Sequence, residues 1–156
     1  MNIRLATEAD LPRVNELRRQ VNDVHVAGKP EVFRPGFSEA LQQHVYTLFA
    51  QEDHAILVAE TEAGIVGFAC LKFVDRPESP YRNAIRYLDV DEFGVDEMHR
   101  RQGIGRALFE AVRGLARKHG LARIELNMWE FNEGALRFYE SIGFSTYRRY
   151  LEMTVD

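Results

Sequence analysis

The segment from Val95 to Val112 passes from a polar loop containing two glycines into a regular helical pattern. From Ile104 onward, apolar residues recur every three or four positions, which is the spacing of one buried helix face. The residues expected on this face are Ile104, Leu108, Ala111, Val112 and Leu115. Gly120 follows where a helix commonly ends. A helix with one apolar face must pack on another element, so the chain is expected to form layers.

Segments with strand-like patterns lie on both sides of this helix. They cover residues 3–6, two β-rich runs between residues 54 and 74, and residues 84–95, 122–130 and 146–155. The turn between the two runs is expected near Ala63 and Gly64, which predicts a hairpin. Gly94 interrupts the alternation of residues 84–95 and predicts a β-bulge or a close backbone approach.

Capping residues predict three further helices. Asp10 is preferred over Thr7 as the first N-cap, because Pro12 then falls in the first turn, where its missing N–H costs nothing. The other two helices are expected to begin after Ser38 and Asn132. The resulting order, βααββββαβαβ, contains no repeat or linker. Residues 1–156 are therefore expected to form one domain of mixed α/β class.

The composition narrows the classes of function. The chain is 46% hydrophobic and 28% charged with a net charge of −4, which argues against general nucleic-acid binding. The single cysteine, Cys70, lies in an apolar run and is expected to be buried rather than catalytic. No segment has the length of apolar residues that a secretion signal or a membrane span needs, so we expect a cytoplasmic protein without membrane contact. The five histidines show no metal-ligand spacing, and no metal is expected.

The loop before residue 104 has the properties of an anion site. A helix N-terminus presents unpaired backbone N–H groups, and Gly103 and Gly105 would allow a phosphate to approach them. Arg100, Arg101 and Arg106 would add charged donors. The loop lacks the third glycine of the Rossmann pattern and the Gly-Lys-Ser/Thr ending of the P-loop. A plain turn with solvated arginines is the simpler interpretation of the loop by itself.

Taken with its neighbours, the loop resembles that of the GNAT superfamily of acyl-CoA-dependent N-acetyltransferases. "RRQGIG" matches the superfamily's Arg/Gln-x-x-Gly-x-Gly/Ala signature, and the similarity extends over nearly the whole chain. It implies a mostly antiparallel sheet flanked by helices, with a bulged central strand. It also implies acetyl-CoA as co-substrate and an amine of a small molecule or peptide as acceptor.

The resemblance assigns roles to particular residues. The pyrophosphate of coenzyme A would be held by Gln102, Gly103, Ile104, Gly105 and Arg106, with Arg100 and Arg101 beside them. The backbone of Phe93, Gly94 and Val95 would pair with the pantetheine arm and polarise the thioester carbonyl. Asn132 would lie near the cofactor, and Tyr139 would protonate the leaving thiolate. Tyr139 also shares a helix face with Ala135 and Ile142, so a core position is the alternative.

An amine must attack in its neutral form, which makes a general base useful. Glu92 is the first candidate and Asp91 the second, since both precede the expected bulge; a positioned water is the alternative. Phe33 and Phe37, in the irregular connection of residues 27–37, either line an acceptor pocket or pack in the loop. The carboxylates of Asp89, Asp91, Glu92 and Glu97 either favour a cationic amine or are simply solvated.

The leading hypothesis is therefore an N-acetyltransferase that uses direct attack in a ternary complex. A noncatalytic acyl-CoA sensor and a generic nucleotide-binding domain are the alternatives. Few residues follow Phe144, so the chain either ends its sheet with one strand or borrows a strand from a second copy in a homodimer.

Overall fold

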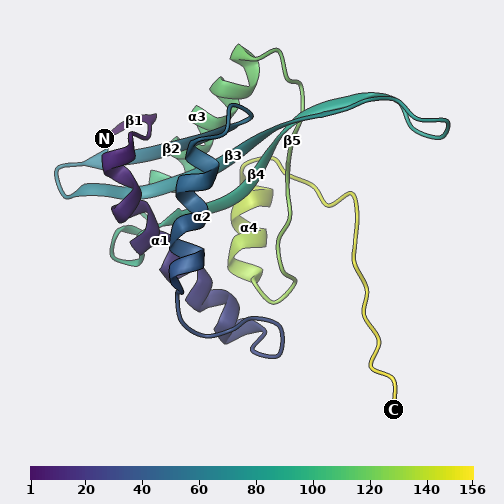
Figure 1. Cartoon of the computed structure of the whole chain (residues 1–156), viewed down its shortest axis with the longest axis horizontal. Helices are drawn as coiled ribbons and strands as arrows, with labels where there is room; N and C mark the ends of the chain where they lie inside the picture. Colours follow the sequence, from purple (N-terminus) through teal and green to yellow (C-terminus); the bar gives the residue numbers. More distant parts are fainter.

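A five-stranded sheet with the order β1-β2-β3-β4-β5 forms the centre of the computed structural model, which describes residues 1–156 (Figure 1). The strands are β1 (Asn2–Leu5), β2 (His54–Thr61), β3 (Gly64–Arg76), β4 (Ile85–Val95) and β5 (Ile124–Leu126). The first four pair antiparallel, and β5 pairs parallel to β4. The expected mixed, mostly antiparallel sheet is confirmed. Gly64, with φ of 90°, supplies the expected turn between β2 and β3.

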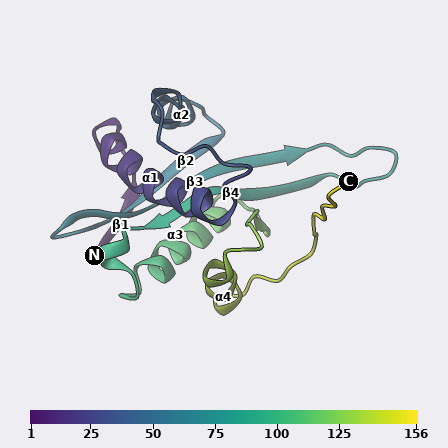
Figure 2. The same ribbon diagram turned by 90° about the horizontal axis from the view of Figure 1, so that it is seen from below.

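Helices cover both faces of the sheet (Figure 2). One face carries α1 (Leu11–Gly28) and α2 (Glu39–Phe49), which bury Leu11, Leu17 and Val45 against β2 and β3. The opposite face carries α3 (Ile104–Lys118), which buries Ile104, Leu108 and Val112, and α4 (Glu133–Ser141), which packs beside it. Two apolar cores thus lie on either side of one sheet. None of these helices is both long enough and apolar enough to span a lipid bilayer.

The predicted helix boundaries agree closely with the structure. Ser38 Oγ accepts from the Leu41 amide at 3.3 Å, and Asn132 Oδ1 accepts from the Ala135 amide at 3.1 Å, as N-caps should. Asp10 does precede α1, with Pro12 in its first turn, but its carboxylate caps no amide of α1. It accepts instead from the Thr7 amide at 2.7 Å, because a 3-10 turn, η1 (Glu8–Asp10), precedes the helix.

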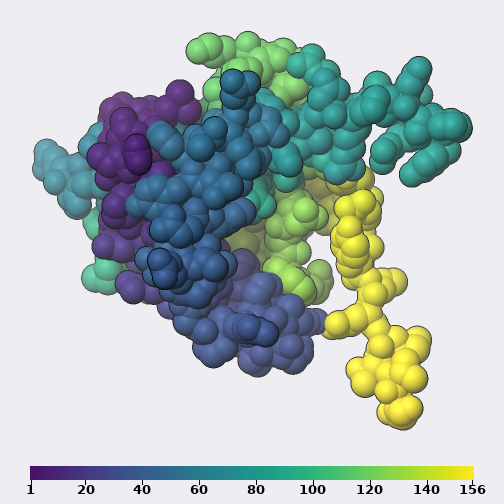
Figure 3. Space-filling view, viewed as in Figure 1, coloured from purple at the N-terminus to yellow at the C-terminus, as the bar shows by residue number.

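Two predictions of strand number are wrong. Three strands, not four, lie between α2 and α3, since β3 continues to Arg76 and pairs directly with β4 over a turn closed by the Ser79–Arg82 bridge. The expected final strand at residues 146–155 is absent. That segment is exposed and extends away from the body (Figures 1 and 3), because no strand of the same chain pairs with the outer edge of β5.

The bulge in β4 lies at Asp91 rather than at Gly94. Glu92 pairs with Cys70, and Val90 pairs with Leu71, which leaves Asp91 as the extra residue. Gly94 pairs regularly with Phe68. A Cβ at Gly94 would lie 2.8 Å from the Phe68 ring and 2.9 Å from Val21 of α1. Gly94 therefore serves the other predicted role, a close approach.

Candidate active site

The strands β4 and β5 separate shortly after they meet. They pair only through Leu88–Val90 of β4 and Ile124–Leu126 of β5, and β5 is much shorter than the predicted residues 122–130. Beyond Val90 and the bulge at Asp91, residues 92–95 of β4 pair with β3 alone. The edge of β4 that faces away from β3 is thus left without a strand partner. It provides backbone donors and acceptors at an opening in the middle of the sheet.

The loop before α3 adds a second set of free peptide groups. Arg101 and Gly103 both have positive φ, 65° and 80°, which turns the chain sharply into the helix. The first bond of the helix is donated by the Ala107 amide to the Gly103 carbonyl at 3.0 Å. None of the amides from Gln102 to Arg106 donates to a backbone carbonyl. Together with the helix dipole, these amides form a site suited to an anion.

Packing brings this loop to the open edge of β4. A Cβ at Gly105 would lie 3.2 Å from the Phe138 ring of α4 and 3.7 Å from Val95 of β4. Gly103 has open space where its Cβ would project. Gly105 is therefore required by contact inside the protein, whereas Gly103 is required by its backbone conformation and leaves the outer side of the loop clear.

The arginines of the loop lie on its exposed side. Arg100, Arg101 and Arg106 are all exposed, as is Gln102, and Ile104 is buried beneath them. Arg100 Nε donates to the Val95 carbonyl at 3.3 Å, which ties the loop to the end of β4. The side chains of Arg101 and Arg106 make no ion pair within the protein and can reach an anion at the loop.

Tyr139 lies among aromatic rings on the α3 face of the sheet. Its ring is 6.3 Å from Phe93, 6.3 Å from Phe109 and 5.7 Å from Phe144. Burial raises the pKa of Tyr139 to about 12, so the hydroxyl keeps its proton at neutral pH. The contact with Phe93 places Tyr139 beside β4. Asn132 begins the same helix, with its side-chain oxygen committed to the cap.

Glu92 is held by a residue that the sequence did not mark as functional. Arg18 of α1 is almost fully buried, and it donates from Nε and Nη2 to the two oxygens of Glu92, both at 2.7 Å. Arg18 also donates to Asn15 Oδ1 and the Leu41 carbonyl. Asp91, at the bulge, is exposed and makes no ion pair. Arg18 was detectable in principle, because it lies one turn after Val14 on the buried face of α1.

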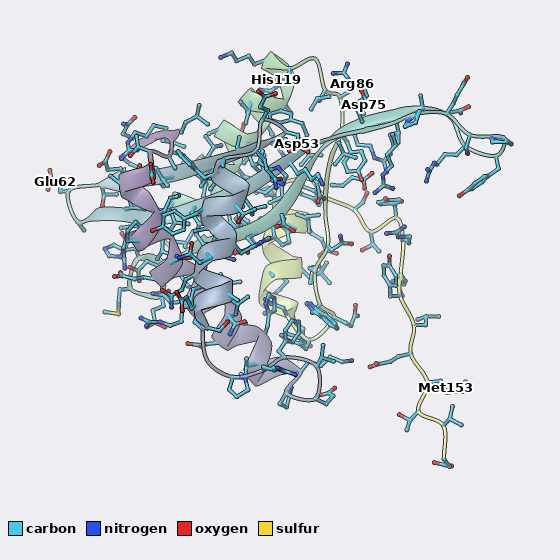
Figure 4. The ribbon with its side chains drawn as sticks, in the orientation of Figure 1. Asp53, Glu62, Asp75, Arg86, His119 and Met153 are labelled. Atoms are coloured by element: carbon cyan, nitrogen blue, oxygen red, sulfur yellow. The ribbon has the colours of Figure 1, made fainter.

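The residues expected near the acceptor take different positions. Phe37 packs under the Arg18 guanidinium, with 5.4 Å between the group and the ring centroid. Phe33 stacks on His25 at 5.1 Å and meets Trp129 edge-on at 5.1 Å. Cys70 is buried, and burial raises the pKa of its thiol, so the structural interpretation of this cysteine is favoured. A surface pocket of about 310 Å³ lies elsewhere, around His54, Phe73 and His119. His119, at the far end of α3, marks its place in Figure 4.

Comparison with known proteins agrees with this geometry. The model of the acetyltransferase (GNAT) family matches residues 19–144, which is most of the chain. The [ribosomal protein bS18]-alanine N-acetyltransferase of Escherichia coli is 41% identical over 80 residues, 47% of this chain and 54% of that protein. The chain spans between 37% and 54% of the length of the curated relatives it matches.

Solved structures share the fold over the whole chain. A tetramutant of the BH1408 protein from Bacillus halodurans is 30% identical, with a TM-score of 0.95, and the match covers 99% of this chain and 100% of that one. Aminoglycoside N-acetyltransferase AAC(6')-Iy, solved in complex with CoA, is only 15% identical, with a TM-score of 0.77 and coverage of 99% and 93%. That second likeness concerns the fold alone.

Proposed function

The chain belongs to the acetyltransferase (GNAT) family, and on this basis we propose that it transfers an acetyl group from acetyl-CoA to a primary amine. One observation carries the proposal: two sets of unpaired peptide groups, on β4 and at the start of α3, border a single opening. A long ligand with an anionic end and an amide-containing arm matches both sets. Acetyl-CoA has this chemistry.

The cofactor-binding residues follow from this match. The amides from Gln102 to Arg106 would hold the pyrophosphate, with Arg100 and Arg101 at its side. The free edge at Phe93, Gly94 and Val95 would pair with the pantetheine arm, as a strand partner would. Asn132, which begins α4, would lie near the cofactor. Acetyl-CoA supplies the activated acetyl group, and the protein positions it.

Tyr139 is proposed as the general acid. Its pKa of about 12 means that the hydroxyl is protonated when the thiolate leaves, and the Phe93 contact places the ring next to the proposed pantetheine position. A noncatalytic acyl-CoA sensor has no need of a protonated hydroxyl at this point, and no feature of the site favours it over the enzyme. The acceptor amine would attack directly in a ternary complex.

The acceptor is proposed to be the amine of a small molecule or peptide. Burial and the neighbouring carboxylates of Asp91 and Glu125 raise the pKa of Asp89, so a further negative charge would be unfavourable near the point where β4 and β5 part. An amine that is cationic in solution would be attracted by the negative potential of these carboxylates. The two carboxylates first considered as bases have different surroundings. Glu92 is paired with Arg18, whereas Asp91 is exposed.

We also propose a homodimer formed through residues 145–156. Several large apolar side chains of this segment are exposed, among them Leu151 at 92%, Met153 at 87% and Val155 at 85%. They alternate along the chain as the residues of one strand face do. Met153 lies far from the body of the molecule (Figure 4). A second copy, whose β5 has the same open edge, offers this segment a strand partner.

The proposed function is tested by acetyl-CoA binding followed by turnover. At one hundred times its dissociation constant, acetyl-CoA should stabilise the fold by about 2.7 kcal/mol, and ATP and NAD should give no comparable shift. Thiol release should then appear with at least one member of a panel of amines, amino acids and peptides. Binding without release from any amine would favour the sensor, and equal shifts with all three ligands would favour a generic nucleotide site.

A further inference from the structure

Helix α1 crosses the open end of the sheet on the face opposite to α3. Arg18 meets Glu92 of β4 at 2.7 Å, and Val21, one turn later, lies against Gly94. His25 lies one further turn along the same helix face. By that point α1 has passed β4 and reached the chain that follows β5. The His25 ring contacts Phe131 there, with 6.2 Å between centroids.

These contacts place His25 on the α1 face of the sheet, one turn past the residue that meets β4 and against the chain that follows β5. Phe131 stands edge-on to the imidazole at 81°, and Phe33 stacks on it at 20°. The two rings hold the imidazole on two sides. His25 is nonetheless only half-buried, and neither of its ring nitrogens has a hydrogen-bond partner in the protein or is sealed from solvent. A positioned imidazole with both nitrogens free needs an explanation.

Burial, and not the nearby charge, favours the neutral form of His25. Burial lowers its pKa, and the Glu92 carboxylate opposes this only in part. The elements packed against it, the connection of residues 29–38 and the chain after β5, present the rings of Phe33 and Phe131. Lys29, at the end of α1, lies over the Trp129 ring at 5.6 Å and is paired with Glu31 and Glu152. A neutral imidazole can accept a proton at neutral pH.

We propose that His25 is the general base of the acetyl transfer, an inference that rests on the proposed function. Its free ring nitrogen would accept the amine proton, directly or through one water, as the new N–C bond forms and the C–S bond breaks. Tyr139 would give its proton to the leaving thiolate from the other face of the sheet. Proton exchange with solvent then restores the imidazole and the phenol. Glu92, held by Arg18, would stabilise the imidazolium across the opening.

The test compares pH profiles of kcat/KM for the unmodified protein, His25→Gln and His44→Gln. His44 is an exposed histidine of α2 and serves as the matched control. The unmodified protein should lose activity as the pH falls below the ordinary histidine value of about 6.5. His25→Gln should lose about 10²–10⁴-fold in kcat/KM at neutral pH and lack this acid limb, while its acetyl-CoA affinity stays within about threefold. His44→Gln should behave as the unmodified protein does.

A second measurement needs no substitution. The pKa of His25, followed by NMR in the unmodified protein, should equal the pKa of the acid limb. This comparison can be made even if His25→Gln folds poorly. Three results would overturn the role of His25 and leave acetyl transfer intact. They are an unchanged profile for His25→Gln, a mismatch between the two pKa values, and loss of the acid limb in Asp91→Asn instead of His25→Gln. Absence of turnover in the unmodified protein would remove the proposed function and this role together.

Discussion

Tyr139 illustrates how one physical cause serves both packing and chemistry. The rings of Phe93, Phe109 and Phe144 enclose it, and this removal of water is the cause of its raised pKa. The two interpretations of Tyr139 left open by the sequence, core residue and proton donor, are therefore compatible. A tyrosine packed among aromatic rings next to β4 is held in position and keeps its proton.

Replacing Tyr139 by Phe should separate these two contributions. The ring stays in place, so we expect little change in thermal stability or acetyl-CoA affinity. The proton donor is lost, so kcat should fall by about 10²–10⁴-fold. Tyr87→Phe is the matched control, because burial also raises the pKa of Tyr87, which lies away from the opening on β4. Equal turnover in the two variants would assign Tyr139 to packing alone.

Single residues were predictable from the sequence where their role is local. Ser38 and Asn132 cap helices as expected, because a cap depends on the next few residues only. Arg18 was not recognised, since its role depends on Glu92, which is remote in the chain and reaches it only in the folded sheet. A charged residue on a buried helix face was the one available signal.

The start of α3 is the element on which the site most depends. Its position is fixed by Gly105 against Phe138 and Val95, and its shape by the positive φ of Arg101 and Gly103. An added Cβ at Gly103 would meet no protein atom within 4 Å, and it would take up space at the loop proposed to hold the pyrophosphate. The conformation also strains any residue other than glycine.

Gly103→Ala should therefore weaken acetyl-CoA binding. We expect the dissociation constant to rise at least tenfold, about 1.4 kcal/mol, by calorimetric titration. Gly120→Ala controls for strain, because Gly120 has φ of 65°, also has open space around its Cβ, and ends α3 far from the loop. It should lower the thermal midpoint to a similar extent while leaving the affinity unchanged. Equal affinities in the two variants would place the cofactor elsewhere.

Elements were predictable when their pattern is periodic and were misjudged when pairing decides their limits. The buried face of α3 follows from the spacing of its apolar residues, although Phe109 and Ala116 were missed. The bulge at Asp91 and the early end of β5 depend on which strand lies alongside. Gly94 interrupts the apolar and polar alternation of residues 84–95, but the contacts that require a glycine there come from α1 and β3.

At the scale of the whole molecule, the core and the C-terminal segment differ in how far their apolar side chains are buried. Two apolar clusters close both faces of the sheet, whereas residues 145–156 expose apolar side chains to solvent. Three contacts tie this segment to the body. The Tyr147 hydroxyl donates to Glu125 at 2.9 Å, the Arg123 guanidinium lies over the Tyr147 ring at 4.7 Å, and Lys29 pairs with Glu152. The sequence pattern predicted a strand at residues 146–155, which the chain does not form, because no strand of the same chain is available to pair with it.

The double variant Leu151→Asp with Met153→Asp should therefore be monomeric. The unmodified chain should have the mass of two copies in sedimentation or light scattering, because the apolar face of the segment is then covered. Met98→Asp is the control, since Met98 is also highly exposed, at 78%, but lies on η2 (Glu97–His99), away from this segment. An unmodified chain that has the mass of one copy at every concentration would contradict the proposed dimer.

The brief pairing of β4 with β5 has a consequence for hydration. The Val95 carbonyl accepts from Arg100, but the other peptide groups of residues 91–95 on the open edge have no partner within the sheet and must be satisfied by water. The fold thereby forgoes stabilisation that a longer β5 would have provided. A ligand that displaces this water finds the free donors and acceptors already in position. The part of the sheet with the fewest internal hydrogen bonds is therefore also the part prepared to bind a ligand.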